Sequence, residues 1–168
     1  MFFCFGSPRS GTTLISQSLA AHPNIIVPGE TDFIIPTAFL WDRIKNPASR
    51  VALVHAMITE TEYYPHSLAH YLTPDEIYTH LSRNSEDLSG FLDALYDAIA
   101  RKSGAQIAGD KSPNDMGFAA ILRKTDAISP ATKVIHIVRD VRDALAALMS
   151  RRMSPRAEGT FARAWSTN

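Results

Sequence analysis

The sequence predicts an α/β fold in which helices flank a mostly parallel sheet. Short apolar runs typical of buried strands alternate with segments of helical periodicity. A glycine-bounded loop at residues 6–11 joins the first apolar run to the first helical segment. Residues from about 33 to 105 form one largely helical segment between strands. We therefore expect a single domain over residues 1–168 with a helical insertion at about 33–105.

Length and composition are those of an ordinary globular domain. The 168 residues are 45% hydrophobic and 20% charged, which suits one domain with a sizeable core. Seventeen basic and seventeen acidic side chains balance, so charge gives no reason to expect a nucleic-acid partner. No segment is long and apolar enough to span a membrane or to form a signal-peptide core, and we expect a cytoplasmic protein.

The two ends of the sequence favour a fragment. The first predicted strand begins at residue 1, and the sequence stops inside a helical-looking run, FARAWSTN, that contains Trp165. We therefore expect a domain that is truncated at its C-terminus.

The first third of the chain has clear element boundaries. Residues 1–5 form an apolar run that the next glycine stops, which predicts a buried strand. Helical spacing follows over residues 12–21 and ends before Pro23, because a proline disfavours helix in the residue that precedes it. A second short strand is predicted at 25–27, and a helix at about 37–44.

The helical middle carries strong start signals. Thr73 can cap a helix whose first position is Pro74, and Glu76 completes a capping box. Another helix opens at residues 85–87 and ends near Gly104. The elements that follow are a strand at 106–108, a helix near 116–124, a strand at 133–138 and a helix at 140–149.

Polar side chains follow the four predicted strands. Arg9, Glu30, Lys111 and Arg139 each come shortly after one of them. Because ligands of parallel sheets gather at the carboxyl ends of the strands, we expect these four side chains to share one edge of the sheet.

Residues 6–13, GSPRSGTT, have the frame of a phosphate-binding P-loop. A strand, a glycine-bounded loop and a helix start together aim backbone N–H groups at a phosphate oxygen, and Thr12 and Thr13 add hydroxyl donors. A nucleotide triphosphatase carries a lysine where this sequence has Thr12. Arg9, inside the loop, replaces that charge with a planar fork of donors suited to a phosphate or a sulfate.

The sequence also lacks a good carboxylate for magnesium. Such a carboxylate normally follows an apolar strand, but the strand at 133–138 is followed by Arg139, which repels a cation. The remaining candidates, Asp110 and Asp140, adjoin Lys111 and Arg139. We therefore expect chemistry that uses basic side chains and no metal.

Four segments resemble the sulfotransferases that use 3′-phosphoadenosine 5′-phosphosulfate (PAPS). They occur in the order of the family, from residue 5 to about 150: PRSGTT with HPN downstream, PGETDFIIP, GDKSPN and VIHIVRDVRDA. The first and last are similar to the two nucleotide-binding signatures of that family. PGETDFIIP and GDKSPN are similar to the segments of tyrosylprotein sulfotransferases and related bacterial enzymes that carry a catalytic glutamate and a catalytic lysine.

The resemblance implies a role for each candidate. Glu30 would be the general base, Lys111 would stabilise the transferred group, and Arg139 would bind the 3′-phosphate. Arg9 would both bind and assist catalysis. The 5′-phosphosulfate would be held by Ser7, Pro8, Arg9, Ser10, Gly11, Thr12 and Thr13. PAPS would be the co-substrate, without a metal, and the acceptor would be a hydroxyl (or an amine) on a small molecule, a carbohydrate or a peptide.

One position departs from the pattern of the family. Its members usually carry a serine eight positions after the strand-end arginine, as a second ligand of the 3′-phosphate. Counting from Arg139, that position is Ala147, and Ser150 is the nearest serine.

The residues alone also allow simpler roles. Glu30 could cap a helix that begins near Thr31, and Arg139 could pair with Asp140 or Asp143. Two other functions fit a glycine-bounded loop: a magnesium-dependent P-loop kinase or hydrolase, and a non-catalytic phosphonucleotide-binding module.

Several other side chains fit a structural role. Cys4 is expected to be a buried thiol, and His136, inside a predicted strand, a core histidine. His66 and His70 have a spacing that could bind a metal, but no third ligand is evident. Four tyrosines of the helical middle are expected to pack between helices, with an acceptor cleft as the alternative: Tyr63, Tyr64, Tyr71 and Tyr78.

Overall fold

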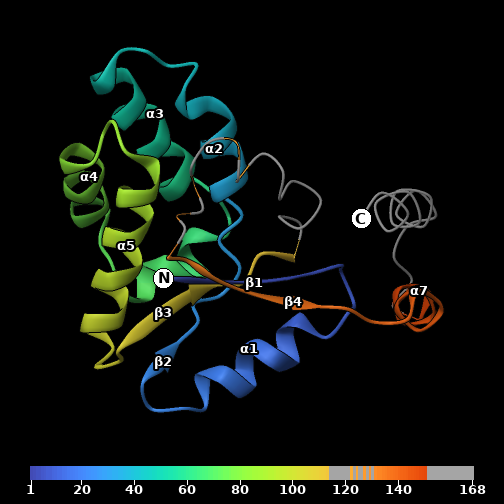
Figure 1. Cartoon of the computed structure of the whole chain (residues 1–168). Helices are drawn as coiled ribbons and strands as arrows, with labels where there is room; N and C mark the ends of the chain where they lie inside the picture. The colour runs from blue at the N-terminus through green and yellow to red at the C-terminus, as the bar shows by residue number, and fades with distance from the viewer. Residues whose placement is uncertain (114–121, 123, 125–126, 128, 130, 151–168) are drawn as a thin grey trace.

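A computed structural model describes residues 1–113, 122, 124, 127, 129 and 131–150. Within that part of the chain the fold is α/β, as predicted, and helices flank one sheet (Figure 1). Within the described residues the sheet has four strands in the order β2-β3-β1-β4, and every pair is parallel. The strands are β1 (Phe2–Gly6), β2 (Ile25–Ile26), β3 (Ile107–Asp110) and β4 (Lys133–Ile137).

Strand β1 lies between β3 and β4 and is buried along its whole length. Its sequence, FFCFG, is the continuous apolar run that a strand covered on both faces requires. Phe2 pairs with Gly109 of β3, and a Cβ on that glycine would fall 2.2 Å from the Phe2 ring. The glycine therefore makes room for an aromatic side chain of the central strand.

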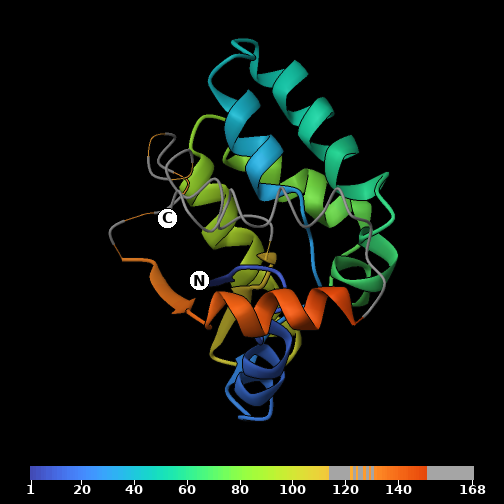
Figure 2. The ribbon, with the colours of Figure 1, turned by 90° about the vertical axis from the view of Figure 1, so that its right-hand side faces the viewer.

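The helices cover the two faces of the sheet unequally (Figures 1 and 2). Among the described helices, α1 lies alone on one side, whereas α2 to α5 form a helical lobe on the other; α7 lies beyond the ends of β1 and β4. The helices are α1 (Thr12–Ala20), α2 (Ile34–Trp41), α3 (Pro47–Thr59), α4 (Pro74–Arg83), α5 (Leu88–Lys102) and α7 (Val141–Met149). Two 3₁₀ turns, η1 (Tyr64–His66) and η2 (Leu68–His70), join α3 to α4.

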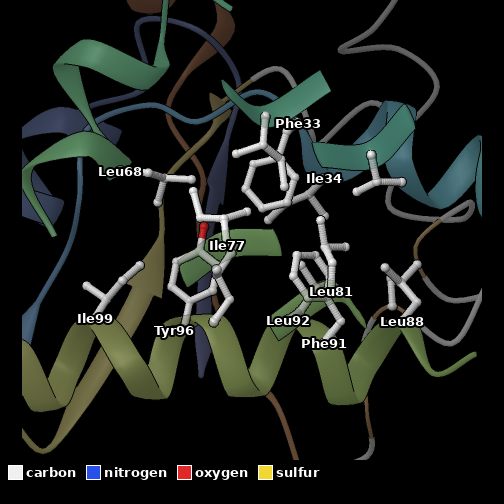
Figure 3. Packing of buried hydrophobic residues seen from close by; sticks show 14 of the residues in the cluster. Phe33, Ile34, Leu68, Ile77, Leu81, Leu88, Phe91, Leu92, Tyr96 and Ile99 are labelled. Atoms are coloured by element: carbon white, nitrogen blue, oxygen red, sulfur yellow. The ribbon is translucent and has the colours of Figure 1, made fainter. Parts of the chain in front are cut away.

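Helix α5 supplies the centre of the hydrophobic core. Figure 3 shows its buried side chains packed against Phe33, which precedes α2, and against residues of α2 and α4, including Ile34, Ile77 and Leu81. The buried positions of α5 recur at helical spacing: Leu88, Phe91, Leu92, Leu95, Tyr96 and Ile99. This packing fixes the lobe against the sheet.

Local signals set the start of two lobe helices. The Thr73 hydroxyl accepts from the Glu76 N–H, and the Glu76 carboxylate accepts from the Thr73 N–H at 2.8 Å, which completes the predicted capping box of α4. Asp87 caps α5 by accepting from the Gly90 N–H.

The structure corrects the predicted start of one helix. Helix α2 begins at Ile34, three residues before the predicted position, and Pro36 lies within its first turn. A proline is tolerated there because the N–H that it lacks would have no partner inside the helix. Burial of Phe33, Ile34 and Ala38 favours the earlier start.

The structure also corrects the role of His136. This residue is exposed, not part of the core, because β4 lies at one side of the described sheet and its outer face is largely uncovered. Cys4, by contrast, is fully buried as expected, and burial raises the pKa of its thiol. Of the predicted helix near 116–124 only residues 122 and 124 are described, and the residues around Trp165 lie outside the described part of the chain.

Among the residues that the structure describes, no helix combines the length and the apolar character needed to cross a bilayer.

Candidate active site

The loop after β1 is shaped by close contacts that only glycine permits at its first position. A Cβ on Gly6 would fall 2.5 Å from the Ser10 hydroxyl oxygen and 2.7 Å from a Thr12 methyl carbon. The loop is closed by a turn in which the Ser10 N–H donates to the Ser7 carbonyl at 3.0 Å. The loop therefore folds back over the end of its own strand.

Two loop residues have left-handed backbone conformations. Gly11 has a φ of 106°, which costs a glycine little, but Arg9 has a φ of 69°, which is unusual for a residue with a side chain. Such conformations persist where the surrounding structure imposes them, and they cluster at binding sites.

Two buried polar atoms of the loop have no partner among the described residues: Nε of Arg9 and the hydroxyl oxygen of Ser10. A buried polar group without a partner is costly, so each such group calls for an explanation. An anion seated in the loop would satisfy both, because both can donate a hydrogen bond. These side chains therefore fit a bound phosphate or sulfate.

Helix α1 begins without a side-chain cap. Its N-cap is Gly11, and its first turn contains no acidic residue. Thr12 is buried at the start of the helix, and Thr13 is exposed. Because the amides of a first turn lack partners inside the helix, this end carries a partial positive charge and suits an anion.

Arg139 reaches the same loop from the end of β4. Its guanidinium donates to the Arg9 carbonyl at 3.1 Å, and the side chain is exposed. The alternative partner Asp140 is bound instead by the Arg142 guanidinium, at 2.8 Å, and caps α7. Arg139 therefore contacts the loop of residues 6–13, which we call the anion loop.

The departure at Ala147 falls on α7. Ala147 is half-buried, and the Ser150 hydroxyl one turn later donates to the Ala147 carbonyl at 3.1 Å. In this arrangement the serine caps the end of its own helix.

Glu30 and Lys111 form an ion pair. Nζ of Lys111 donates to Oε1 of Glu30 at 2.5 Å. The lysine side chain is 7% exposed, and the glutamate side chain is 38% exposed. The capping role considered for Glu30 has no counterpart here, because α2 starts at Ile34 and its N-cap, Phe33, forms no side-chain cap bond. A buried cation thus holds a carboxylate that reaches the surface.

Asp110, a residue that the sequence analysis set aside, is wholly buried beside this pair. Its Oδ1 accepts from the Thr31 hydroxyl at 2.7 Å and from the Tyr96 hydroxyl at 2.6 Å. Burial raises the pKa of Asp110, and these two hydrogen bonds oppose that rise. The signal in the sequence was its position directly before Lys111, at the end of a strand.

A pocket of about 320 Å³ opens beside Glu30, lined by Glu30, Glu62, Tyr63 and His66. Gly29 allows the Glu30 loop to approach η1, since a Cβ there would fall 2.7 Å from the His66 carbonyl oxygen. The pKa of Tyr63 is raised, first by the charge of Asp32 and a hydrogen bond to it, and further by Glu62 and Glu30. The pocket is therefore rich in carboxylates, and neither Glu62 nor His66 was expected to line it.

The parallel sheet brings the loop after β1, the Lys111–Glu30 pair and Arg139 to one edge. The loop follows β1, Lys111 follows β3 and Arg139 lies just beyond β4, and β1 pairs with both neighbours. Lys111 and Asp110 lie close enough to Cys4 on β1 to influence the pKa of its thiol. The described residues include no group of three or more His, Cys, Asp or Glu side chains placed to hold a metal ion.

Comparison with known proteins gave a family and a fold. A model of the sulfotransferase family matches residues 2–166. Among solved structures, the sulfotransferase domain from the Synechococcus PCC 7002 olefin synthase matches with a TM-score of 0.54 and 21% sequence identity. That match covers 98% of this chain and 55% of the other, so this chain spans about half the length of that structure. A comparison with curated proteins found no match.

The crowding at Gly6 generates a prediction. Gly6→Ala should displace Ser10 and Thr12 and weaken the binding of pyrophosphate by about tenfold, the equivalent of one charge-assisted hydrogen bond of ~1.5 kcal/mol. Isothermal titration calorimetry measures the affinity. The control is Gly104→Ala, which strains a left-handed position after α5 (φ 69°) and leaves the loop unchanged. Equal affinities of Gly6→Ala and the unaltered chain would show that the loop does not bind the anion.

Proposed function

Because the chain belongs to the sulfotransferase family, we propose that it moves a sulfuryl group from PAPS to an acceptor hydroxyl or amine. The observation that carries this proposal is the Lys111–Glu30 ion pair at the strand edge that also carries an anion loop without the P-loop lysine. An ATP-hydrolysing P-loop would need that lysine and a magnesium carboxylate, whereas this edge offers Arg9, Lys111 and Arg139.

The donor half of the proposed site is the loop. The backbone N–H groups of Arg9, Gly11, Thr12 and Thr13, the buried Nε of Arg9 and the Ser10 hydroxyl would hold the 5′-phosphosulfate, as the unpartnered atoms support. Arg139 would take the 3′-phosphate from the neighbouring strand end. Its contact with the Arg9 carbonyl supports a shared site, because one ligand could then touch both arginines.

In the proposed reaction, the acceptor oxygen attacks sulfur in line and forms the new S–O bond. The bond between sulfur and the bridging oxygen breaks, and 3′,5′-adenosine bisphosphate leaves with the bonding electrons. Glu30 accepts the acceptor proton. As Glu30 loses its negative charge, the buried Lys111 ammonium loses its counter-charge and becomes free to stabilise the charge that grows on the bridging oxygen.

The acceptor would enter through the pocket beside Glu30. Glu30 is both a lining residue of this pocket and the partner of Lys111, so a hydroxyl in the pocket can approach base and cation together. The surrounding carboxylates Glu62 and Asp32 favour a neutral or positively charged acceptor over an anionic one.

The first prediction of the proposed function concerns which nucleotide the site prefers. We expect 3′,5′-adenosine bisphosphate to bind more tightly than ATP, with no gain from magnesium, because the positive charges of the site come from side chains. Calorimetry with both nucleotides, with and without magnesium, measures this preference. Tighter binding of magnesium-ATP would favour a kinase or a hydrolase. Bisphosphate binding without sulfate transfer to any acceptor would favour a non-catalytic binding module.

The second prediction tests the base. Glu30→Gln keeps the size of the side chain and removes its basicity, so turnover from PAPS should fall roughly 100-fold to 10,000-fold. The affinity for 3′,5′-adenosine bisphosphate should change little, because Glu30 faces the acceptor pocket. Steady-state kinetics and calorimetry give the two values.

A control for Glu30→Gln is Glu86→Gln, which neutralises an exposed carboxylate outside the pocket. It should leave both turnover and affinity unchanged. Full turnover of Glu30→Gln would mean that another group takes the proton.

The third prediction tests the charge of the acceptor with three phenols of similar size. Sulfation of tyramine, which is cationic, should exceed that of 4-hydroxyphenylacetate, which is anionic, by about 25-fold, because the two differ by two unit charges and each charge pair at 4 Å in water contributes ~1 kcal/mol, or about fivefold. Neutral tyrosol should fall between them. Glu62→Gln should reduce the difference in sulfation between tyramine and 4-hydroxyphenylacetate. The reverse order would place the acceptor outside this pocket.

A further inference from the structure

The loop that carries Glu30 is attached to the end of β3 at three consecutive residues. Glu30 pairs with Lys111, the Thr31 hydroxyl donates to Asp110, and the N–H of Asp32 donates to the Ser112 hydroxyl oxygen at 3.3 Å. The Thr31 N–H also donates to the Ser112 hydroxyl oxygen, at 3.4 Å. We call these contacts between residues 30–32 and 110–112 the loop clasp.

Local secondary structure does not fix the backbone of residues 30–32, which we call the Glu30 loop. Asp32 has a φ of 50°, a left-handed conformation that costs energy for a residue with a side chain. Residues 30–32 belong to no helix or strand. The conformation must therefore be imposed by contacts with other segments, and the loop clasp supplies them.

The central residues of the loop clasp are buried, and they rest on a strand and a core helix. Thr31 is 3% exposed, Asp110 1% and Ser112 0%. Tyr96, the second donor to Asp110, stands on α5 within the hydrophobic core, as Figure 3 shows. Asp110 is thus fixed by a strand and by a core helix, and it offers Thr31 an acceptor whose position does not depend on the Glu30 loop.

We propose that Thr31 is a positioning residue for the transfer reaction: its hydrogen bond to Asp110 holds the neighbouring Glu30 carboxylate against Lys111 and beside the acceptor pocket. This inference rests on the proposed role of Glu30 as the base. Thr31 lies inside the protein and acts through Glu30, and it is assigned no contact with the reacting atoms.

The geometry explains why this bond matters more than its own strength. Glu30 is 38% exposed and its carboxylate is held at one end by the ion pair with Lys111, while the backbone on its N-terminal side is Gly29. The first firm attachment on the C-terminal side is the buried hydroxyl of Thr31. Loss of that attachment frees the backbone that sets the direction of the base.

The test compares three substitutions in the full chain. Thr31→Val removes the hydroxyl at nearly constant volume, Thr31→Ser keeps it, and Thr37→Val is the matched control. Thr37 is also a buried threonine, 0% exposed, but its hydroxyl has no hydrogen-bond partner among the described residues. Each variant is assayed for kcat and for KM of a fixed phenol acceptor, for affinity to 3′,5′-adenosine bisphosphate, and for melting temperature.

The expected pattern separates positioning from stability. Thr31→Val should lower kcat by about 10-fold to 100-fold, the cost of misplacing a catalytic group by roughly 1 Å, with bisphosphate affinity unchanged. Thr31→Ser should restore kcat, and Thr37→Val should keep it. A Thr31→Val enzyme that melts earlier but keeps the kcat of Thr37→Val would overturn the inference. If Thr31→Val does not fold, Ser112→Ala removes the other anchor of the loop clasp and is judged by the same criteria.

A structural measurement keeps this inference distinct from the proposed function. A crystal structure of Thr31→Val should show the Lys111 Nζ–Glu30 Oε1 distance lengthened beyond hydrogen-bond range. A lengthened distance in Thr31→Val, with no sulfate transfer by the unaltered chain, would sink the proposed function and leave only the finding that Thr31 holds Glu30 against Lys111. An unchanged distance would sink the positioning role, whatever the activity.

Discussion

The parallel pairing of β1 with both β3 and β4 is the constraint on which the site depends. In a parallel sheet the strands run in one direction, so the chain leaves every strand at the same edge. The register aligns Phe3 with Asp110 and Gly6 with Ile137. The anion loop, Lys111 and Arg139 therefore follow three adjacent strands. Had one of these strands been antiparallel, its polar residue would have emerged at the opposite edge of the sheet.

The site places charge where burial is costly, and the surrounding groups offset that cost in different ways. Lys111 is buried and is neutralised by Glu30 at 2.5 Å. Asp110 is buried too, and hydrogen bonds to Oδ1 solvate it in part, while its Oδ2 has no partner among the described residues. The loop leaves Nε of Arg9 and the Ser10 hydroxyl unsatisfied. The loop thus has polar atoms that a ligand could satisfy, whereas the Lys111–Glu30 pair is already balanced without one.

The sequence allowed the local features to be predicted, because their causes lie within a few residues. The strand–loop–helix pattern around Gly6, the capping box at Thr73 and the opening of a helix at residues 85–87 are of this kind. The start of α2 was predicted three residues late because no local signal marks Ile34, and the tertiary burial of Phe33 and Ile34 favours the earlier start. His136 was misjudged because the burial of a strand residue depends on what covers the sheet.

The contacts that make the site are long-range, which is why pattern alone could not assign them. Glu30 and Lys111 are 81 residues apart, and Arg9 and Arg139 are 130 apart. The sequence predicted that these four side chains share one edge of the sheet, but it did not identify the residues that they contact. The roles of Asp110, Thr31 and Glu62 had no local pattern, because each depends on a neighbour from another element.

The helical lobe leaves the sheet after β2 and returns to it at β3, the strand beside β2. Its two ends are therefore pinned side by side by the sheet and by the loop clasp, and the chain between them forms a closed excursion. Closing such an excursion costs entropy that grows slowly with length, about 0.6 kcal/mol for each doubling. Glu62, Tyr63 and His66 belong to this excursion, whereas the anion loop does not. Changes in the length or sequence of the lobe can therefore alter one wall of the pocket without moving the strand edge that carries the basic side chains.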